Sequence, residues 1–192
     1  MMGKRKILLT GGAGFIGLNF VKKIATRAEV KRNYDFLILD ALTYSSSYTS
    51  IQEELEQHPH LSFVQGNICD RKLVSELFNQ HSFSGVINFA AETHVDRSIL
   101  SSAIFAETNV MGTLNLLQCS LQAYAQRPEF RFLQISTDEV YGSLKDDERP
   151  FTEKTPLNPK SPYSATKAGA DCLVLSYYNT YALPVIIPRP SL

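Results

Sequence analysis

Short apolar runs alternate along this chain with longer segments in which apolar residues recur every three to four positions. We predict strands at residues 6–10, 36–40, 61–65, 86–90, 131–136 and 185–187, where leucine and β-branched residues gather. The helical spacing predicts helices at residues 15–27, 51–57, 71–80, 103–125 and 163–181. Short apolar strands separated by helices are typical of a parallel sheet covered on both faces. We therefore predict an α/β protein with a doubly wound parallel sheet, in one domain spanning residues 1–192.

The segment 142–162 interrupts this alternation. It holds the charged run Lys145-Asp146-Asp147-Glu148-Arg149 and four prolines. We interpret it as a solvated loop between the fifth strand and the last helix. A lid over a ligand is the less favoured alternative, since long loops often carry function.

Composition and charge narrow the class of protein. Hydrophobic residues make up 44% of the chain and the net charge is zero, so neither nucleic acid nor a membrane surface is an expected partner. No apolar run approaches the roughly 20 residues that span a bilayer, and no signal peptide is recognisable. Cys69, Cys119 and Cys172 lack the spacing of a zinc site or a disulfide framework. We expect a soluble cytoplasmic protein without a bound metal.

A glycine-rich motif follows the first predicted strand. Gly11, Gly14 and Gly17 are spaced three apart in the segment 10–17, at the start of the first predicted helix. Such a turn presents backbone N–H groups and a helix N-terminus to a pyrophosphate, with no side chain in the way. Glycine-rich turns are common, but the strand–turn–helix context predicts a dinucleotide-binding Rossmann fold.

Two polar residues end the next strands. Asp40 ends the second predicted strand, where a carboxylate binds the ribose hydroxyls and repels a 2′-phosphate, so NAD is favoured over NADP. A turn cap is the alternative role for Asp40. Asn67 follows the third strand and is placed to bind the adenine amino group, although a simple turn role is the default for an asparagine there.

A tyrosine and a lysine begin the last predicted helix. Tyr163 and Lys167 are four residues apart and therefore project from the same helix face. An ammonium beside a phenol favours the phenolate, which predicts a lowered pKa for Tyr163 and a base that can take a hydroxyl proton. A Tyr–Lys pair at this spacing usually lies on the protein surface without a functional role, but the glycine motif earlier in the chain favours a catalytic role.

Two acids follow the fifth predicted strand. Asp138 and Glu139 lie where the carboxyl ends of parallel strands form the ligand crevice. Neighbouring acids can serve as acid and base when their environments separate their pKa values. The alternative is a pair of solvated acids at a strand–loop junction.

Together these segments resemble the dTDP-glucose 4,6-dehydratase family of the extended short-chain dehydrogenase/reductases. The glycine motif and the Tyr163–Lys167 pair are shared by all extended relatives, including epimerases and decarboxylases. The triplet Thr137-Asp138-Glu139 and the run 90–98 are more specific and favour a dehydratase. The segments that carry the resemblance are 10–17, 40–44, 90–98, 108–113, 136–142 and 158–167.

The resemblance implies a lyase that oxidises the sugar at C4, eliminates water between C5 and C6, and returns the hydride to C6, with NAD kept bound. It implies that Tyr163 takes the proton of the C4 hydroxyl and that Glu139 takes the C5 proton. Asp138 would protonate the departing C6 hydroxyl and Thr137 would bind the C4 oxygen. Lys167 would hold the nicotinamide ribose and tune Tyr163.

The resemblance also implies the remaining contacts. His94 would approach the substrate, and two copies would pair through helices 103–125 and 163–181 into a homodimer. In addition to the glycines, Asn67, Tyr163 and Lys167, the NAD site would be lined by Phe15, Ile16, Asp40, Ala41, Leu42, Thr43, Ile68, Ala90, Ala91 and Thr108.

Two features depart from the family pattern. The family usually has Asp at the position of Asn67, so an altered adenine contact is expected. The family also continues beyond residues 188–191 into a substrate domain that grips the nucleotide. We therefore expect a truncated chain whose own activity is open, and the base of the sugar nucleotide and the downstream pathway stay open as well.

Two alternatives stand beside the dehydratase. A nucleotide-sugar 4-epimerase or decarboxylase would share the oxidation at C4 but would need no acid–base pair to expel water. A catalytically inactive NAD-binding fragment would bind NAD and turn over no sugar.

Overall fold

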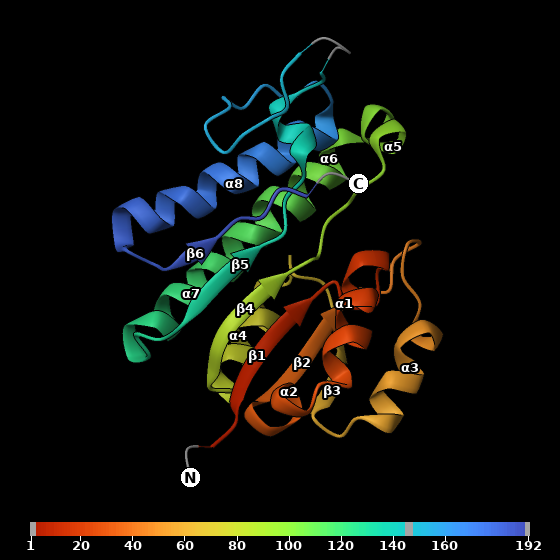
Figure 1. Ribbon diagram of the computed structural model, residues 1–192, viewed down its shortest axis with the longest axis vertical. Coiled ribbons are helices and arrows are strands. Elements are labelled where there is room, and N and C mark those ends of the chain that lie inside the picture. The colour runs from red at the N-terminus through yellow and green to blue at the C-terminus, as the bar shows by residue number, and fades with distance from the viewer. Residues whose placement is uncertain (1–2, 145–147, 191–192) are drawn as a thin grey trace.

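Six parallel strands form the centre of the protein, whose computed structural model describes residues 3–144 and 148–190 (Figure 1). The sheet order is β3-β2-β1-β4-β5-β6, and every neighbouring pair is parallel. The order reverses between β1 and β4, which is the point where doubly wound folds bind ligands. The strands are β1 Arg5–Thr10, β2 Tyr34–Asp40, β3 Leu61–Gln65, β4 Phe83–Asn88, β5 Arg131–Gln134 and β6 Val185–Ile186.

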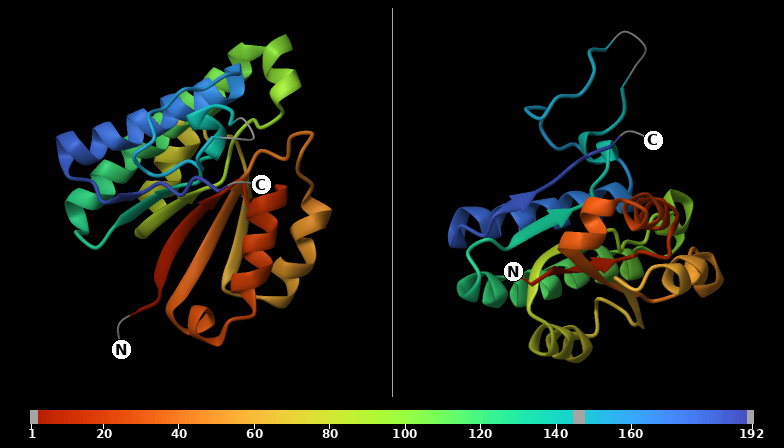
Figure 2. Two further views of the ribbon diagram at one scale, coloured as in Figure 1. Left: turned by 45° about the horizontal axis from the view of Figure 1, so that its top comes forward. Right: turned by 60° about the horizontal axis from the view of Figure 1, so that its bottom comes forward.

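Helices cover both faces of the sheet, as predicted. Helices α1 (Phe15–Ala25) and α3 (Tyr48–Gln57) pack over one face, around Leu9 and Ile38. Helices α4 (Arg71–Gln80), α7 (Thr113–Gln126) and α8 (Pro162–Tyr181) pack over the other. Both views in Figure 2 show α7 and α8 on one side of the molecule and α1 and α3 on the other. The doubly wound architecture predicted from the sequence is confirmed.

The structure adds short elements that the periodicity did not predict. These are α2 (Ala28–Asn33), α5 (Val95–Leu100) and a 3₁₀ turn at Asp138–Tyr141. The long helix predicted at 103–125 is three pieces, α6 (Ser102–Phe105), a π-helix (Ala106–Gly112) and α7. The buried Asn109 lies in the π-helix and exchanges hydrogen bonds with the backbone of Glu92, at 2.8 and 3.0 Å. This tertiary contact accompanies a local widening of the helix that side-chain periodicity cannot reveal.

Most of the described residues of the loop 142–162 are exposed and none is buried, as expected for a solvated loop. Residues 145–147 of its charged run lie outside the described residues. In the described part, Phe151 and Leu157 pack against a small cluster formed by Val140, Tyr141 and Ala168. None of the described loop residues before Pro162 lines the cleft presented below, so nothing here supports the lid. Within the described residues, no helix is long and apolar enough to cross a membrane.

Candidate active site

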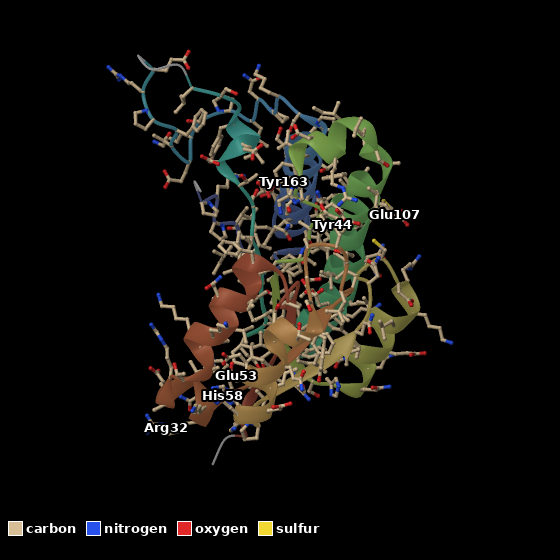
Figure 3. The ribbon with its side chains drawn as sticks, turned by 90° about the vertical axis from the view of Figure 1, so that its right-hand side faces the viewer. Arg32, Tyr44, Glu53, His58, Glu107 and Tyr163 are labelled. Atoms are coloured by element: carbon tan, nitrogen blue, oxygen red, sulfur yellow. The ribbon has the colours of Figure 1, made fainter. Side chains whose placement is uncertain are left out.

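A cleft of about 910 Å³ lies at the carboxyl ends of the strands. Figure 3 shows Tyr44, Glu107 and Tyr163 at this end, and Arg32, Glu53 and His58 at the opposite end. The lining of the cleft includes nearly every residue predicted for the site: Gly11, Gly14, Phe15, Ile16, Gly17, Asp40, Ala41, Thr43, Asn67, Ile68, Ala90, Ala91, His94, Thr108, Thr137, Asp138, Glu139 and Tyr163. Leu42 and Lys167 were also predicted, but they lie outside this lining.

The glycine loop can hold only glycine at two of its positions. Gly11 has φ +70°, and a Cβ there would lie 2.5 Å from the backbone N of Ala90. A Cβ on Gly17 would overlap the carbonyl oxygen of Gly11. Helix α1 begins after Gly14 without a side-chain cap or an acidic residue in its first turn, so its first N–H groups are free to face an anion. The geometry fits a pyrophosphate.

Asp40 connects the end of β2 to the glycine loop. The carboxylate is buried and accepts the backbone N–H of Ala13 through Oδ2 at 2.9 Å. Its Oδ1 accepts the N–H of Leu42 and the hydroxyl of Ser46, both at 2.9 Å. The turn-capping role is therefore present. The same carboxylate also lines the cleft, so the cap and a ribose contact do not exclude one another.

Asn67 and Ile68 form the end of the cleft beside β3. The Asn67 Oδ1 accepts the backbone N–H of Cys69 at 2.9 Å, which is a turn contact within the loop. Ile68 is buried, and its carbonyl accepts Asn115 Nδ2 at 2.7 Å. The predicted adenine contact of Asn67 would therefore have to share an oxygen that already holds the turn.

Tyr163 and Lys167 lie on the first turns of α8, but their environments differ from the prediction. Burial raises the pKa of Tyr163 to about 12; the nearby Glu139 adds to the rise, and a side-chain hydrogen bond with Thr137 opposes it. The Lys167 ammonium donates to the carbonyl of Ile135 at 2.6 Å. Burial lowers the pKa of Lys167 to about 8. The predicted net lowering of the Tyr163 pKa is therefore wrong, because burial outweighs any help from the lysine.

The turn after β5 presents Thr137, Asp138 and Glu139 to the cleft. The Thr137 hydroxyl accepts the backbone N–H of Glu139 at 3.3 Å and caps the 3₁₀ turn. Burial and the neighbouring Asp138 raise the pKa of the Glu139 carboxyl above its ordinary range. This rise makes ionised Glu139 a stronger base than a solvated glutamate. The phenol of Tyr163 is held beside the turn by its contact with Thr137.

His94 lines the cleft next to a cluster of Tyr44, Glu92 and Arg97, of which only Glu92 also belongs to the lining. The Tyr44 hydroxyl donates to the buried Glu92 at 3.0 Å, and the Arg97 guanidinium lies 3.6 Å from the centre of the Tyr44 ring. The rings of His94 and Tyr44 are 5.6 Å apart. The lining residues that were not predicted are Leu39, Ser45, Ser46, Gly66, Phe89, Glu92, Thr93, Ile104, Glu107, Ser136 and Pro190.

Some of these omissions carried a signal in the sequence and others did not. Glu92 and Thr93 belong to the run 90–98, in which only the histidine was assigned a substrate contact. Ser136 directly precedes the triplet. Ile104 and Glu107 reach the cleft from α6 and the π-helix, whose geometry periodicity does not give.

Comparison with known proteins identifies the family. The model of the GDP-mannose 4,6 dehydratase family matches residues 8–191. The chain is similar to the low-salt glycan biosynthesis protein Agl12 of Haloferax volcanii, with 49% identity over 95% of this chain and 55% of that protein. It is also similar to the dTDP-glucose 4,6-dehydratase of Xanthomonas campestris pv. campestris, with 47% identity over 96% of this chain and 52% of that protein. The chain thus spans about half the length of the curated relatives it matches.

Solved structures show the same relationship. The chain resembles DesIV, a dTDP-glucose 4,6-dehydratase of Streptomyces venezuelae solved with NAD and TYD, with a TM-score of 0.82 and 41% identity over 96% of this chain and 55% of that one. It resembles the UDP-glucose 4-epimerase of Thermotoga maritima less in sequence, with a TM-score of 0.80 and 27% identity over 96% of this chain and 54% of that one. The chain therefore belongs to the GDP-mannose 4,6 dehydratase family.

Proposed function

We propose that this chain carries the NAD site and the acid–base residues of a dTDP-glucose 4,6-dehydratase, a lyase that acts on a nucleotide sugar. The observation that carries the proposal is the convergence of Tyr163 and the turn Thr137–Glu139 on the cleft that the glycine loop borders. Similarity to proteins named dTDP-glucose 4,6-dehydratase supports this substrate.

The residues of the cleft fit NAD. The Gly11–Gly17 loop and the uncapped start of α1 would hold the pyrophosphate, and Asp40 would accept the ribose hydroxyls while disfavouring a 2′-phosphate. Bound NAD would supply the hydride acceptor for C4 and the donor for C6. The Phe15 side chain is 80% exposed at the start of α1 and lines the cleft, so it is open to contact from a ligand.

The acid–base work would fall to this chain's own side chains. Tyr163 Oη would take the proton of the C4 hydroxyl while Thr137 steadies the C4 oxygen. Because burial holds the pKa of Tyr163 near 12, the transfer needs positive charge close to the phenol, which Lys167 and the bound cofactor would supply. Glu139, with its raised pKa, would take the C5 proton and return a proton to C5 when the hydride adds to C6, and Asp138 would give a proton to the departing hydroxyl.

The epimerase is the second candidate, because the fold of this chain also matches about half of a solved epimerase. An epimerase would need Tyr163 and NAD but no acid pair beside the phenol. Asp138 and Glu139 at the cleft therefore favour the dehydratase.

The test is mass spectrometry of dTDP-glucose incubated with this chain and NAD. We expect a product lighter by one water and no net NADH. UDP-glucose serves as the parallel substrate, and its conversion to the C4 epimer, which has the same mass and is therefore followed by NMR, would favour the epimerase instead. NAD binding with both sugars unchanged would favour the inactive NAD-binding fragment.

A homodimer in the cytoplasm completes the proposal. The helical region 103–125 and α8 carry exposed apolar side chains, among them Ile104, Met111, Leu175 and Tyr178. Exposed apolar groups on adjacent helices support pairing of two copies through them. The free thiols of Cys69, Cys119 and Cys172 suit a reducing compartment.

A further inference from the structure

A buried carboxylate on α8 lies beside the segment Ser136–Tyr141, which carries Asp138 and Glu139, and has no part in the proposed acid–base steps. Asp171 has no exposed surface, and its Oδ2 accepts Ser136 Oγ and Arg189 Nε, each at 2.8 Å. Among the described residues, nothing donates a hydrogen bond to its Oδ1. Burying a carboxylate with one bare oxygen is costly, so its position needs a physical explanation.

The partners of Asp171 join separate segments at the turn. Ser136 directly precedes Thr137, so the hydrogen bond that its hydroxyl donates to Asp171 fixes the start of the segment Ser136–Tyr141. Arg189, after β6, also donates to the Tyr141 hydroxyl at 2.8 Å, at the far end of the same segment. One carboxylate therefore connects α8 to both ends of the segment that carries the acid pair.

The backbone of the segment after β6 reinforces this connection. The carbonyl of Pro188 accepts the N–H of Ser136 at 3.0 Å, and that of Pro190 accepts the N–H of Asp138 at 3.2 Å. Arg189 lies between these two contacts and carries the salt bridge to Asp171. The backbone of the segment Ser136–Tyr141 is thus held at Ser136 and Asp138, while the residues Asp138 and Glu139 line the cleft.

Asp171 also faces the lysine of the Tyr–Lys pair. Lys167 lies one helical turn earlier on α8, and the negative charge of Asp171 opposes the lowering of the Lys167 pKa that burial causes. Burial in turn raises the pKa of Asp171, while Arg189, Ser136 and Lys167 work against that rise. The charge state of each group depends on the other.

We propose that Asp171 is a positioning residue that fixes the turn Ser136–Glu139 against α8 and keeps the buried Lys167 ionised. Its catalytic consequence rests on the proposed function, since it concerns the groups that would move protons there. The charged or titratable groups that bear on Asp171 are Lys167 from its own helix, Arg189 after β6, and, through that arginine, Tyr141 of the 3₁₀ turn.

The test follows the Lys167 titration by NMR of chain labelled in the lysine side chain, with the signal assigned by Lys167→Met. Asp171→Asn keeps the shape and removes the charge, and we expect the Lys167 midpoint to fall by about one pH unit or more. Ser136→Ala removes a hydrogen bond from the same carboxylate without removing its charge, and should shift the midpoint much less. An unchanged midpoint in Asp171→Asn would overturn the proposal.

A second measurement needs no variant of Asp171. The carboxyl signal of Asp171 in the unaltered chain should show an ionised group at neutral pH, and a protonated carboxyl would overturn the proposal even if Asp171→Asn failed to fold.

Where the chain turns over dTDP-glucose, Asp171→Asn should lower kcat about tenfold or more with KM nearly unchanged, and Asp171→Glu should restore part of the rate. Failure of the unaltered chain to turn over sugar would contradict the proposed function alone, because both NMR readouts are independent of catalysis.

Discussion

At the scale of single residues, the site combines groups whose proton affinities are set mainly by burial. Sequence spacing correctly brought Tyr163 and the triplet Thr137–Glu139 to one cleft, because strand ends and helix starts fix where side chains emerge. It gave the wrong direction for the Tyr163 pKa, since the spacing of two residues says nothing about the depth at which they lie. The sequence also contained no sign of Asp171, because neither its depth nor its contact with Arg189, 18 residues further along the chain, can be read from residue spacing.

Lys167 should make the stability of the fold depend on pH. Its folded pKa of about 8 lies below the ordinary value of 10.5, so the folded chain releases this proton over a range in which the unfolded chain keeps it. Stability from this group therefore grows as pH rises from 8 toward 10.5 and is lost as pH falls through 8. Lys167→Met lacks this contribution, so the difference in unfolding free energy between the two proteins should change by about 2 to 3 kcal/mol between pH 7 and pH 10. Urea unfolding at both pH values measures it, and a constant difference would contradict the buried charge.

The roles of Glu139 and Tyr163 can be distinguished, because each residue would act in a different step. In a protein that turns over dTDP-glucose, Glu139→Gln should still oxidise C4, so NADH absorbance should appear while water loss slows by about 100-fold or more. Tyr163→Phe should block the oxidation itself and give neither signal. Both are read by rapid absorbance measurement with mass spectrometry of the sugar. Water loss at the unaltered rate in Glu139→Gln would assign the C5 base to another group.

At the scale of elements, periodicity located most strands and helices, but it missed short elements such as α5 and gave one helix at 103–125 where the structure has three pieces. β3 and α4 lie at the predicted residues, because their apolar positions repeat over a full strand or several helical turns. The six-residue α5 is too short for periodicity to show; the buried Ser98 holds it in place by accepting the N–H of Tyr163 at 3.1 Å. This link positions α8, which carries Tyr163 and Lys167, through a contact between segments far apart in sequence.

Helix α1 depends on a close approach of its first turn to the glycine loop. Gly17→Ala would place a methyl group on the carbonyl oxygen of Gly11, so NAD affinity should fall at least tenfold and stability should fall with it. Gly169→Ala on α8 is the matched control: among the described residues its new Cβ would meet only Val110 Cγ2, at 3.5 Å. There we expect unchanged NAD affinity and a gain of about 0.5 to 1 kcal/mol in the free energy of unfolding. Titration calorimetry with NAD and thermal unfolding measure both variants. Equal NAD affinities of Gly17→Ala and Gly169→Ala would contradict the close approach of α1 to the glycine loop.

At the scale of the whole molecule, strand–helix alternation predicted the class of fold and the edge of the sheet that carries the cleft. The order β3-β2-β1-β4-β5-β6 explains why this edge works: the chain crosses from β3 to β4 on the far side of β1, and the reversal opens a crevice between the ends of β1 and β4. The glycine loop follows β1, and Ala90 and Ala91 follow β4, so both sides of the crevice come from the two central strands. Strand order does not show in the same way whether two molecules pair, because exposed apolar residues are compatible with the fold of a monomer and with that of a dimer.

The proposed homodimer therefore needs a test of its own. Leu175 is 40% exposed on α8, and Leu175→Glu would bury a charge in any interface formed there, so the dimer should dissociate at micromolar concentration. Tyr48→Glu on α3 is the control, since Tyr48 is 45% exposed on the opposite face of the sheet. Sedimentation velocity should show a dimer for the unaltered chain and for Tyr48→Glu, and a monomer for Leu175→Glu. A dimer that persists in Leu175→Glu would place the interface away from this part of α8, and a monomeric unaltered chain would refute the proposed pairing.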